Sequence, residues 1–258
     1  SERAGGYGVY YHFDYVGGPR NYKWLNTNQI ARVWEQMNLA WHHGVRQIWI
    51  VNVGDIKPME LPISFFLDHA WNPEAMTLDA MTGYTQTWSA QQFPAEHAAE
   101  ISEILDLYSR YAARRKHELV DAESFSVVNF DEFRRVTGQW EELAERADSL
   151  REELPEGHDD AFVQLVWFPV LASANLYQLY EAVALNRLYA EQGRASDALR
   201  QAQRAKAFFA RDEQLTRVYH HEIAGGKWVH MMSQTHIGYT TWQQPDAQVM
   251  PALSLPLP

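Results

Sequence analysis

Two apolar runs with a helical pattern between them open the chain. Residues 7–13, dense in aromatic and β-favouring side chains, predict a strand. Apolar side chains then recur at helical spacing over residues 30–41, which predicts a helix with Asn28 as its N-cap and Gly44 as its stop. The mostly apolar run 47–53 predicts a second strand. The chain therefore begins with a strand–helix–strand unit.

Nearly continuous apolar strands joined by a crossover helix predict parallel pairing in a sheet that is covered on both faces. No comparable strand pattern follows residue 60, and two parallel strands do not form a stable sheet alone. We therefore expect the remaining strands of the sheet to lie outside this chain, before Ser1.

The rest of the chain has helical patterns. Apolar side chains over residues 101–112 form one stripe, which predicts an amphipathic helix that begins at Pro94. The charged residues 114–117 end this helix and are expected in solvent. Pro169 predicts a kink or a boundary in a later helix. Further helices are predicted at about 129–152, 160–192, 195–210 and 212–223, and an irregular tail after residue 243.

Composition narrows the function classes. Among 258 residues, 22 are basic and 33 acidic, so the formal charge of −11 repels nucleic acid and anionic membranes. A site for an anionic ligand then needs local cations. The chain has no cysteine, which excludes thiol catalysis, zinc fingers, iron–sulfur clusters and disulfides. No apolar run approaches about 18 residues, so no membrane span is expected.

Polar side chains gather where each predicted strand ends. Alternation along the first strand places Tyr10, His12 and Asp14 on one face, and the second strand ends at Asn52, followed by Asp55. Parallel α/β folds build their sites at this end of the strands. His12 and Asp14 either serve such a site or satisfy each other and the loop backbone. Asp55 is either a ligand or catalytic carboxylate, or it caps the turn that follows it.

The loop over residues 17–26 is longer than a simple strand–helix turn, and long loops are often functional. Arg20 or Lys23 can pair with a carboxylate ligand, and Tyr22 or Trp24 can present an apolar face to a ring of a ligand. The alternative is that the aromatic side chains pack beneath the loop and the cations are solvated.

Residues 228–245 are rich in side chains with polar tips, among them His236 and Tyr239. No metal-ligand spacing fits this segment cleanly. We expect it to tie the end of the chain onto a neighbouring part of the protein.

Four runs resemble glycoside hydrolase family 115, the xylan α-1,2-glucuronidases. They are residues 6–26 (with Tyr-Tyr-His-Phe-Asp-Tyr-Val-Gly-Gly-Pro-Arg at their centre), 48–60, 62–68 and 234–245. The resemblance implies an α/β part followed by an all-α part. Residues 1–93 would hold the terminal strands of a (β/α)8 TIM barrel that is incomplete in this chain, residues 94–245 a helical bundle, and residues 246–258 a linker or tail.

The resemblance implies removal of (4-O-methyl-)glucuronic acid from glucuronoxylan with inversion, which uses an acid and a base carboxylate about 6.5–9.5 Å apart. It also implies that His12 is a site histidine, and that the acid and base precede the first matched run, so that this chain alone is inactive. Strand-end geometry and charge add further candidates. The catalytic candidates are His12, Asp14 and Asp55, and the substrate-binding candidates are Tyr10, Arg20, Lys23, Trp24 and Asn52.

The resemblance further implies no cofactor or metal, and as partners the polysaccharide or its oligosaccharides and the remaining domains of the same polypeptide. The full-length bacterial protein would be secreted or periplasmic, and a homodimer stays open. One alternative function is a non-catalytic helical module that docks a partner or binds polysaccharide through some of its 10 Trp and 13 Tyr side chains. Another is a metal-dependent oxygenase with His12, Asp14 and His236 as iron ligands.

Overall fold

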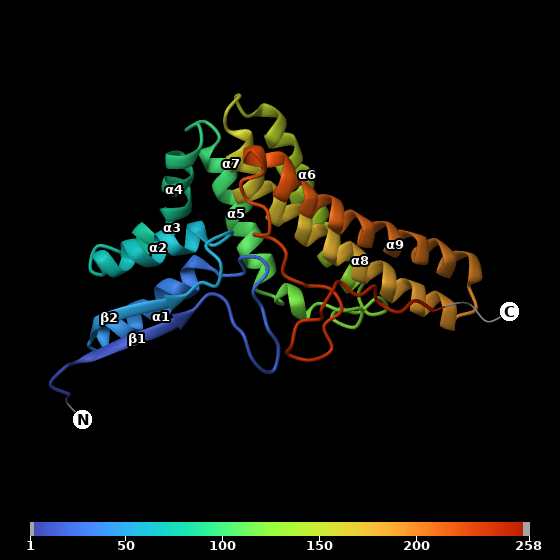
Figure 1. The fold of residues 1–258 in the computed structure, drawn as a ribbon, viewed down its shortest axis with the longest axis horizontal. Coiled ribbons are helices and arrows are strands. Elements are labelled where there is room, and N and C mark those ends of the chain that lie inside the picture. Colours follow the sequence, from blue (N-terminus) through green and yellow to red (C-terminus); the bar gives the residue numbers. More distant parts are fainter. Residues whose placement is uncertain (1–2, 255–258) are drawn as a thin grey trace.

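A computed structural model describes residues 3–254 of the chain (Figure 1). Strands β1 (Tyr7–His12) and β2 (Val45–Asn52) pair in parallel, and helix α1 (Ile30–His42) connects them. The register runs from Gly8 opposite Ile48 to His12 opposite Asn52. The predicted strand–helix–strand unit with parallel strands is therefore confirmed.

Only the C-terminal end of α1 lies where the sequence predicted it. Gly44 adopts φ +82°, and its N–H donates to the carbonyl oxygen of Trp41 at 3.0 Å, so the predicted stop is confirmed. At the other end Gln29 is the N-cap, and the prediction of Asn28 is wrong. The Asn28 amide is occupied elsewhere, because it donates to the Asn26 side chain at 3.0 Å.

The described sheet is covered on one face. Val9, Tyr11, Trp49 and Val51 pack against a small core that includes side chains of α1 and of α2 (Glu60–Trp71). The opposite face is open, since the exposed fractions of Tyr10, Ile48 and Ile50 are 61%, 58% and 47%. Within residues 3–254 the sheet is therefore covered on one face, and the expected cover of its second face stays a prediction.

Helices make up the remainder, as predicted (Figure 1). A short pair follows α2, and longer helices then form a bundle in which α8 and α9 lie side by side. In chain order the elements are α3 (Leu78–Thr82), α4 (Tyr84–Gln92), α5 (Ala98–Ala112), η1 (His117–Leu119), α6 (Glu132–Glu153), α7 (Asp159–Phe162), η2 (Val163–Trp167), α8 (Phe168–Glu191), α9 (Ala195–Arg217), η3 (Val218–Glu222) and η4 (Ile223–Gly226).

Two helix boundaries differ from the sequence prediction. Helix α5 begins at Ala98, four residues after Pro94. The two helices predicted on either side of residue 211 form one helix, α9, which runs on to Arg217. The boundary predicted at Pro169 is confirmed, because Pro169 lies in the first turn of α8, where a missing N–H is tolerated, and the π-helical turn η2 precedes that helix.

The segment Asp159–Glu191 corrects the hydropathy expectation. The segment is 33 residues long and contains an 18-residue window with a mean hydropathy of 1.2, so by length and composition it could cross a membrane. However, 89% of that window is buried inside the protein, where α8 packs between α6 and α9. Its apolar character therefore matches that of a core helix in the bundle.

The main core joins the helical part to the loop that follows β1. Trp24 and Leu25 belong to the same buried cluster as the side chains of α5, α6 and α8. The proposed domain limits at residues 93 and 245 stay predictions, and residues 255–258 of the predicted tail lie outside the described residues.

Candidate functional site

Asn52, at the end of β2, connects two of the predicted site residues. Its amide donates to Asp14 Oδ1 at 2.7 Å and lies 3.4 Å from Nδ1 of His12. The parallel register explains this contact, since His12 and Asn52 are direct partners across the sheet. Within residues 3–254, both side chains contact Asn52 and no hydrogen bond joins them to each other.

Asp14 is a buried carboxylate just beyond the end of β1. Burial raises its pKa above the usual value, while the Asn52 hydrogen bond and the charges of Lys23 and His12 oppose that rise. The nearby Asp55 carboxylate adds to the rise in the pKa of Asp14. The strand end thus holds a carboxyl group whose protonation depends on its immediate neighbours.

Gly54 allows the backbone just after β2 to pass close to this carboxylate. It adopts φ +63°, and a Cβ atom at this position would lie 2.5 Å from Asp14 Oδ2 and 2.8 Å from Asp14 Cγ. A side chain at residue 54 therefore meets both backbone strain and a steric clash.

We expect Gly54→Ala to displace the Asp14 carboxylate and to lower the free energy of unfolding by about 1–3 kcal/mol. Gly44→Ala is the matched control, because Gly44 also has a positive φ, at +82°, but its Cβ would meet no atom within 4 Å. The control should lose only the strain energy. Chemical denaturation of both variants measures the difference, and equal losses would contradict a close approach at Gly54.

His12 and Tyr10 are exposed on the open face of the sheet. Their ring centroids are 4.6 Å apart, and the ring of Tyr15 lies 6.2 Å from that of His12. The imidazole is therefore held by aromatic neighbours and Asn52 while it faces the space above the sheet.

Asp55 is exposed and accepts a hydrogen bond from the side-chain amide of Gln234. In the described chain its carboxylate accepts no hydrogen bond from the turn at residues 56–58, so the capping alternative is not observed. The contact with Gln234 links the end of β2 to the C-terminal segment.

Arg20 connects parts of the chain that are far apart in sequence. Its Nη1 donates to the carbonyl oxygen of Glu118 at 3.0 Å and to that of Tyr239 at 3.5 Å, and its guanidinium lies 5.6 Å from the centre of the Tyr239 ring. The guanidinium is thus engaged within the protein. The expected contact between Arg20 and a substrate carboxylate has no support in this arrangement.

Trp24 lies in the core, with an exposed fraction of 1%. Its ring stacks on His236 with centroids 3.4 Å apart and planes 2° from parallel, and the edge of His117 approaches it as well. This corrects the expectation that Trp24 binds substrate, because its ring has no face free for a sugar. The alternative, packing beneath the loop, is what the structure shows.

His236 is held away from the strand-end residues. Its Nε2 lies 2.8 Å from Asp212 Oδ1, and its Nδ1 lies 2.9 Å from the carbonyl oxygen of Gln234. In the part of the chain that the structure describes, no group of three or more His, Asp or Glu side chains could hold a metal ion. The iron triad of the oxygenase alternative is therefore not assembled.

Unlike Arg20, Lys23 has an ammonium group that is free to contact a ligand. Its ammonium has no hydrogen bond or ion pair to any described residue, and its charge acts on the pKa of Asp14. Of the two predicted cations, Lys23 is the one that can face an anionic ligand.

Residues 116–118 pack against the loop after β1, and the sequence pattern did not reveal these contacts. The expectation that residues 114–117 are solvated is wrong for Lys116 and His117. The Lys116 ammonium donates to Thr27 Oγ1 at 2.6 Å, and burial lowers its pKa to about 8. His117 is fully buried, which lowers its pKa to about 3. Their partners are far away in sequence, so no local pattern signals these contacts.

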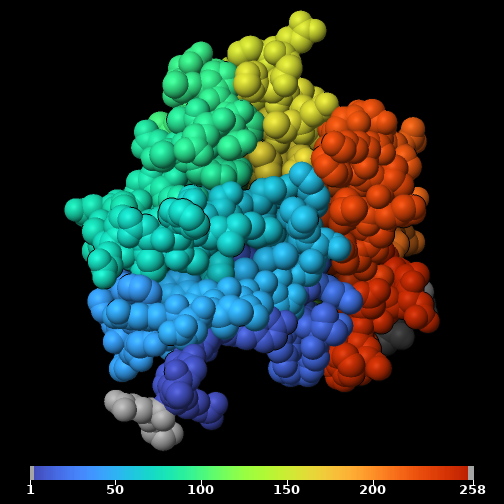
Figure 2. Space-filling model, turned by 60° about the vertical axis from the view of Figure 1, so that its left-hand side comes forward, coloured from blue at the N-terminus to red at the C-terminus, as the bar shows by residue number. Residues whose placement is uncertain are grey.

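The segment over residues 228–245 ties the end of the chain onto the strand part, as predicted. Besides the contacts of Gln234 and Tyr239, the N–H of Asn21 donates to the carbonyl oxygen of Trp242 at 3.4 Å. Figure 2 shows the blue loop after β1 against the red C-terminal segment.

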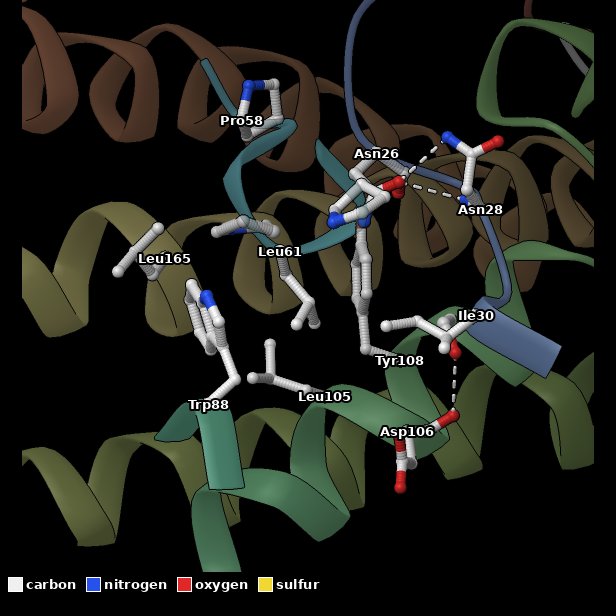
Figure 3. A pocket seen from close by; sticks show the side chains of 13 residues that line it. Asn26, Asn28, Ile30, Pro58, Leu61, Trp88, Leu105, Asp106, Tyr108 and Leu165 are labelled. Atoms are coloured by element: carbon white, nitrogen blue, oxygen red, sulfur yellow. Dashed lines mark hydrogen bonds between the residues drawn. The ribbon is translucent and has the colours of Figure 1, made fainter. Parts of the chain in front are cut away.

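A cavity at the junction of loop and helices is lined by Asn26, Asn28, Leu105 and Tyr108, among others (Figure 3). Its volume of about 20 Å³ holds roughly one water molecule and excludes a sugar. A larger hollow of about 210 Å³ opens beside His12 and Lys116. Hollows of about 280, 490 and 530 Å³ open elsewhere on the described part of the chain, so the hollow beside His12 is singled out by its place at the strand end and not by its size.

Comparisons with known proteins give a consistent result. Residues 1–119 match the model of Glycosyl hydrolase family 115. No curated protein matches the chain. Among solved structures, the chain is similar to a family GH115 4-O-methyl-alpha-glucuronidase with specificity for decorated arabinogalactans, with 25% identity and a TM-score of 0.75 over 98% of this chain. The chain spans about a third (34%) of the length of that structure. Residues 1–119 are therefore similar to glycosyl hydrolase family 115, and the described fold resembles that of a family GH115 enzyme.

Proposed function

We propose that this chain supplies one side of the active site of a glycoside hydrolase that removes (4-O-methyl-)glucuronic acid side chains from a plant polysaccharide. The observation that carries the proposal is the Asp14–Asn52–His12 cluster, which lies at the carboxyl ends of two parallel strands inside the segment that matches family 115. Glucuronoxylan is the proposed substrate. The substrate named for the structural relative makes decorated arabinogalactans the second polymer to test.

Each strand-end residue has a chemical role in this proposal. His12, exposed beside Tyr10, donates to a sugar hydroxyl or holds the attacking water. The Lys23 ammonium faces the substrate carboxylate. Asp14 and Asp55 are the carboxylates that this chain brings to the strand ends, where an inverting reaction needs an acid and a base with room for water between them.

The open face of the sheet supports the proposal that β1 and β2 are strands of a larger (β/α)8 barrel. Its apolar side chains Tyr10, Ile48 and Ile50 are exposed, and only one edge of each strand is paired within residues 3–254. We propose that other parts of the same polypeptide cover this face and complete the acid–base pair. We further propose that the complete protein acts outside the cytoplasm, where its polymeric substrate lies.

We expect the isolated 258 residues to release no uronic acid from glucuronoxylan or from a glucuronate-decorated arabinogalactan, because the uncovered face of the sheet leaves the proposed barrel, and with it the acid–base pair, incomplete. The complete polypeptide should release it, with the β-anomer as first product by NMR if the reaction inverts.

Equal turnover by the isolated chain and the complete polypeptide would contradict the incomplete site. Failure of the complete polypeptide to cleave either polymer would contradict the proposed function. If both the isolated chain and the complete polypeptide bind xylan and neither cleaves it, the protein is a polysaccharide-binding module and not a hydrolase.

A further inference from the structure

One buried carboxylate of the helical part holds the loop after β1. Glu118 lies in η1 with an exposed fraction of 3%, and its Oε1 accepts the backbone N–H groups of Lys23 at 2.7 Å and Trp24 at 2.9 Å. Two consecutive peptide groups, 94 and 95 positions away in sequence, thus converge on a single oxygen. The contact joins the helical bundle directly to the loop that carries Lys23.

The chemistry of this contact makes it specific. An ionised carboxylate forms charge-assisted hydrogen bonds with N–H groups, and these are stronger than bonds between neutral groups. Burial raises the pKa of Glu118, and the two backbone N–H groups oppose that rise. Loss of the carboxylate would leave both N–H groups buried without a partner, which is costly.

The restraint extends from Lys23 back to the strand end. Tyr22, the next residue, forms an antiparallel bridge with Tyr15 through two backbone hydrogen bonds of 3.0 Å each. Tyr15 directly follows Asp14. A shift of Lys23 and Trp24 therefore moves Tyr22 and Tyr15, and with them the backbone of Asp14.

We propose that Glu118 is a positioning residue for the strand-end site. It touches no substrate, and it acts by fixing the loop so that Lys23 and Asp14 keep their places relative to His12. The inference rests on the proposed function for its catalytic consequence, whereas its structural consequence can be measured without any activity.

Three variants of the complete polypeptide test the proposal. Glu118→Ala removes the acceptor, whereas Glu118→Gln keeps an acceptor oxygen with the same reach. Asn186→Ala is the matched control. Asn186 is also buried and hydrogen-bonded to backbone groups, those of Ala198 and Ser254, but it lies near the C-terminal end of α8. It should lower stability without reaching the loop.

We expect Glu118→Ala to lower kcat for uronic acid release by about 10–100-fold, since a misplacement of about 1 Å costs this much. Glu118→Gln should keep kcat within roughly threefold of that of the unmodified protein. Asn186→Ala should keep kcat within about twofold. Both alanine variants should melt at a lower temperature than the unmodified protein. If the two alanine variants lose kcat equally, or if Gln gives no recovery, Glu118 only stabilises the fold and the proposal is wrong.

Hydrogen exchange separates this result from a failure of the proposed function. In Glu118→Ala, the amides of Lys23 and Trp24 should exchange at least about tenfold faster, with faster exchange spreading to Tyr15 and Tyr22. In Asn186→Ala these amides should be unchanged. Unchanged exchange in Glu118→Ala would overturn the positioning role whether or not the protein cleaves glucuronoxylan. Faster exchange in a protein without such activity would sustain the restraint and reject only the glucuronidase assignment.

Discussion

His12→Ala should lower kcat for uronic acid release by the complete polypeptide by at least about tenfold, and by as much as about 10²–10⁴-fold if His12 transfers a proton. The imidazole is exposed at the strand end, where its neighbours include Tyr10, Tyr15 and Asn52. Removal of the imidazole breaks the long 3.4 Å contact with the Asn52 amide, which still donates to Asp14, so the melting temperature should hardly change. Parallel assays of sugar release and thermal unfolding measure both effects.

His43→Ala provides the control for this experiment. His43 is also exposed, but it lies at the end of α1 that leads into the start of β2, at the opposite end of the sheet from His12. The control should keep its normal kcat. Near-normal turnover in His12→Ala would remove His12 from the site, and a large loss of stability would mean that the ring mainly supports the strand.

The strand-end cluster was predictable because its geometry is local. Alternation along β1 and the parallel register to β2 follow from side-chain patterns over a few residues, and together they bring His12 and Asn52 side by side. Asp14 departs from simple alternation. It lies beyond the last paired residue, where the N–H groups of Phe13 and Asp14 both point to the Asn52 carbonyl oxygen, at 2.8 and 3.4 Å. The carboxylate therefore turns inward and is buried while His12 stays exposed.

The environment of the loop was not predictable from its own sequence. Arg20 and Trp24 have the composition of a ligand-binding loop, yet their partners are Glu118, His236 and Tyr239, at least 94 positions away. No periodicity within the loop distinguishes an aromatic ring that faces a sugar from one that faces a distant histidine. Tertiary contacts decided between the two alternatives, in favour of packing for Trp24.

The helix boundaries show the same division between local and tertiary information. Apolar stripes located the longer helices because burial of one face leaves a period in the sequence. The errors occurred where a single residue was taken as a signal. Gln29, and not Asn28, is the N-cap of α1, and α5 begins at Ala98 rather than at Pro94. Caps depend on which partner a polar side chain finds, and neighbours in space determine that partner.

Trp24→Ala should lower the free energy of unfolding by about 3–5 kcal/mol, which is the range for the loss of a buried Trp side chain. The ring is 1% exposed, stacks on His236 and packs beside His117, so its removal leaves a cavity between the loop and the helical bundle. Loss of the indole ring also removes the stacking partner of His236, which is otherwise held by its contact with Asp212. Equilibrium denaturation measures the loss.

Trp71→Ala is the matched control, because Trp71 has the same side chain but is 91% exposed at the end of α2. Its replacement should change the free energy of unfolding by less than about 0.5 kcal/mol. The two outcomes separate the opposing interpretations of Trp24. A packing role predicts a large loss of stability for Trp24→Ala, with KM for the polysaccharide changed only as far as the loop moves. A sugar-binding role predicts the reverse, a raised KM with nearly normal stability, and that result would show that the loop opens in the complete protein to expose the ring.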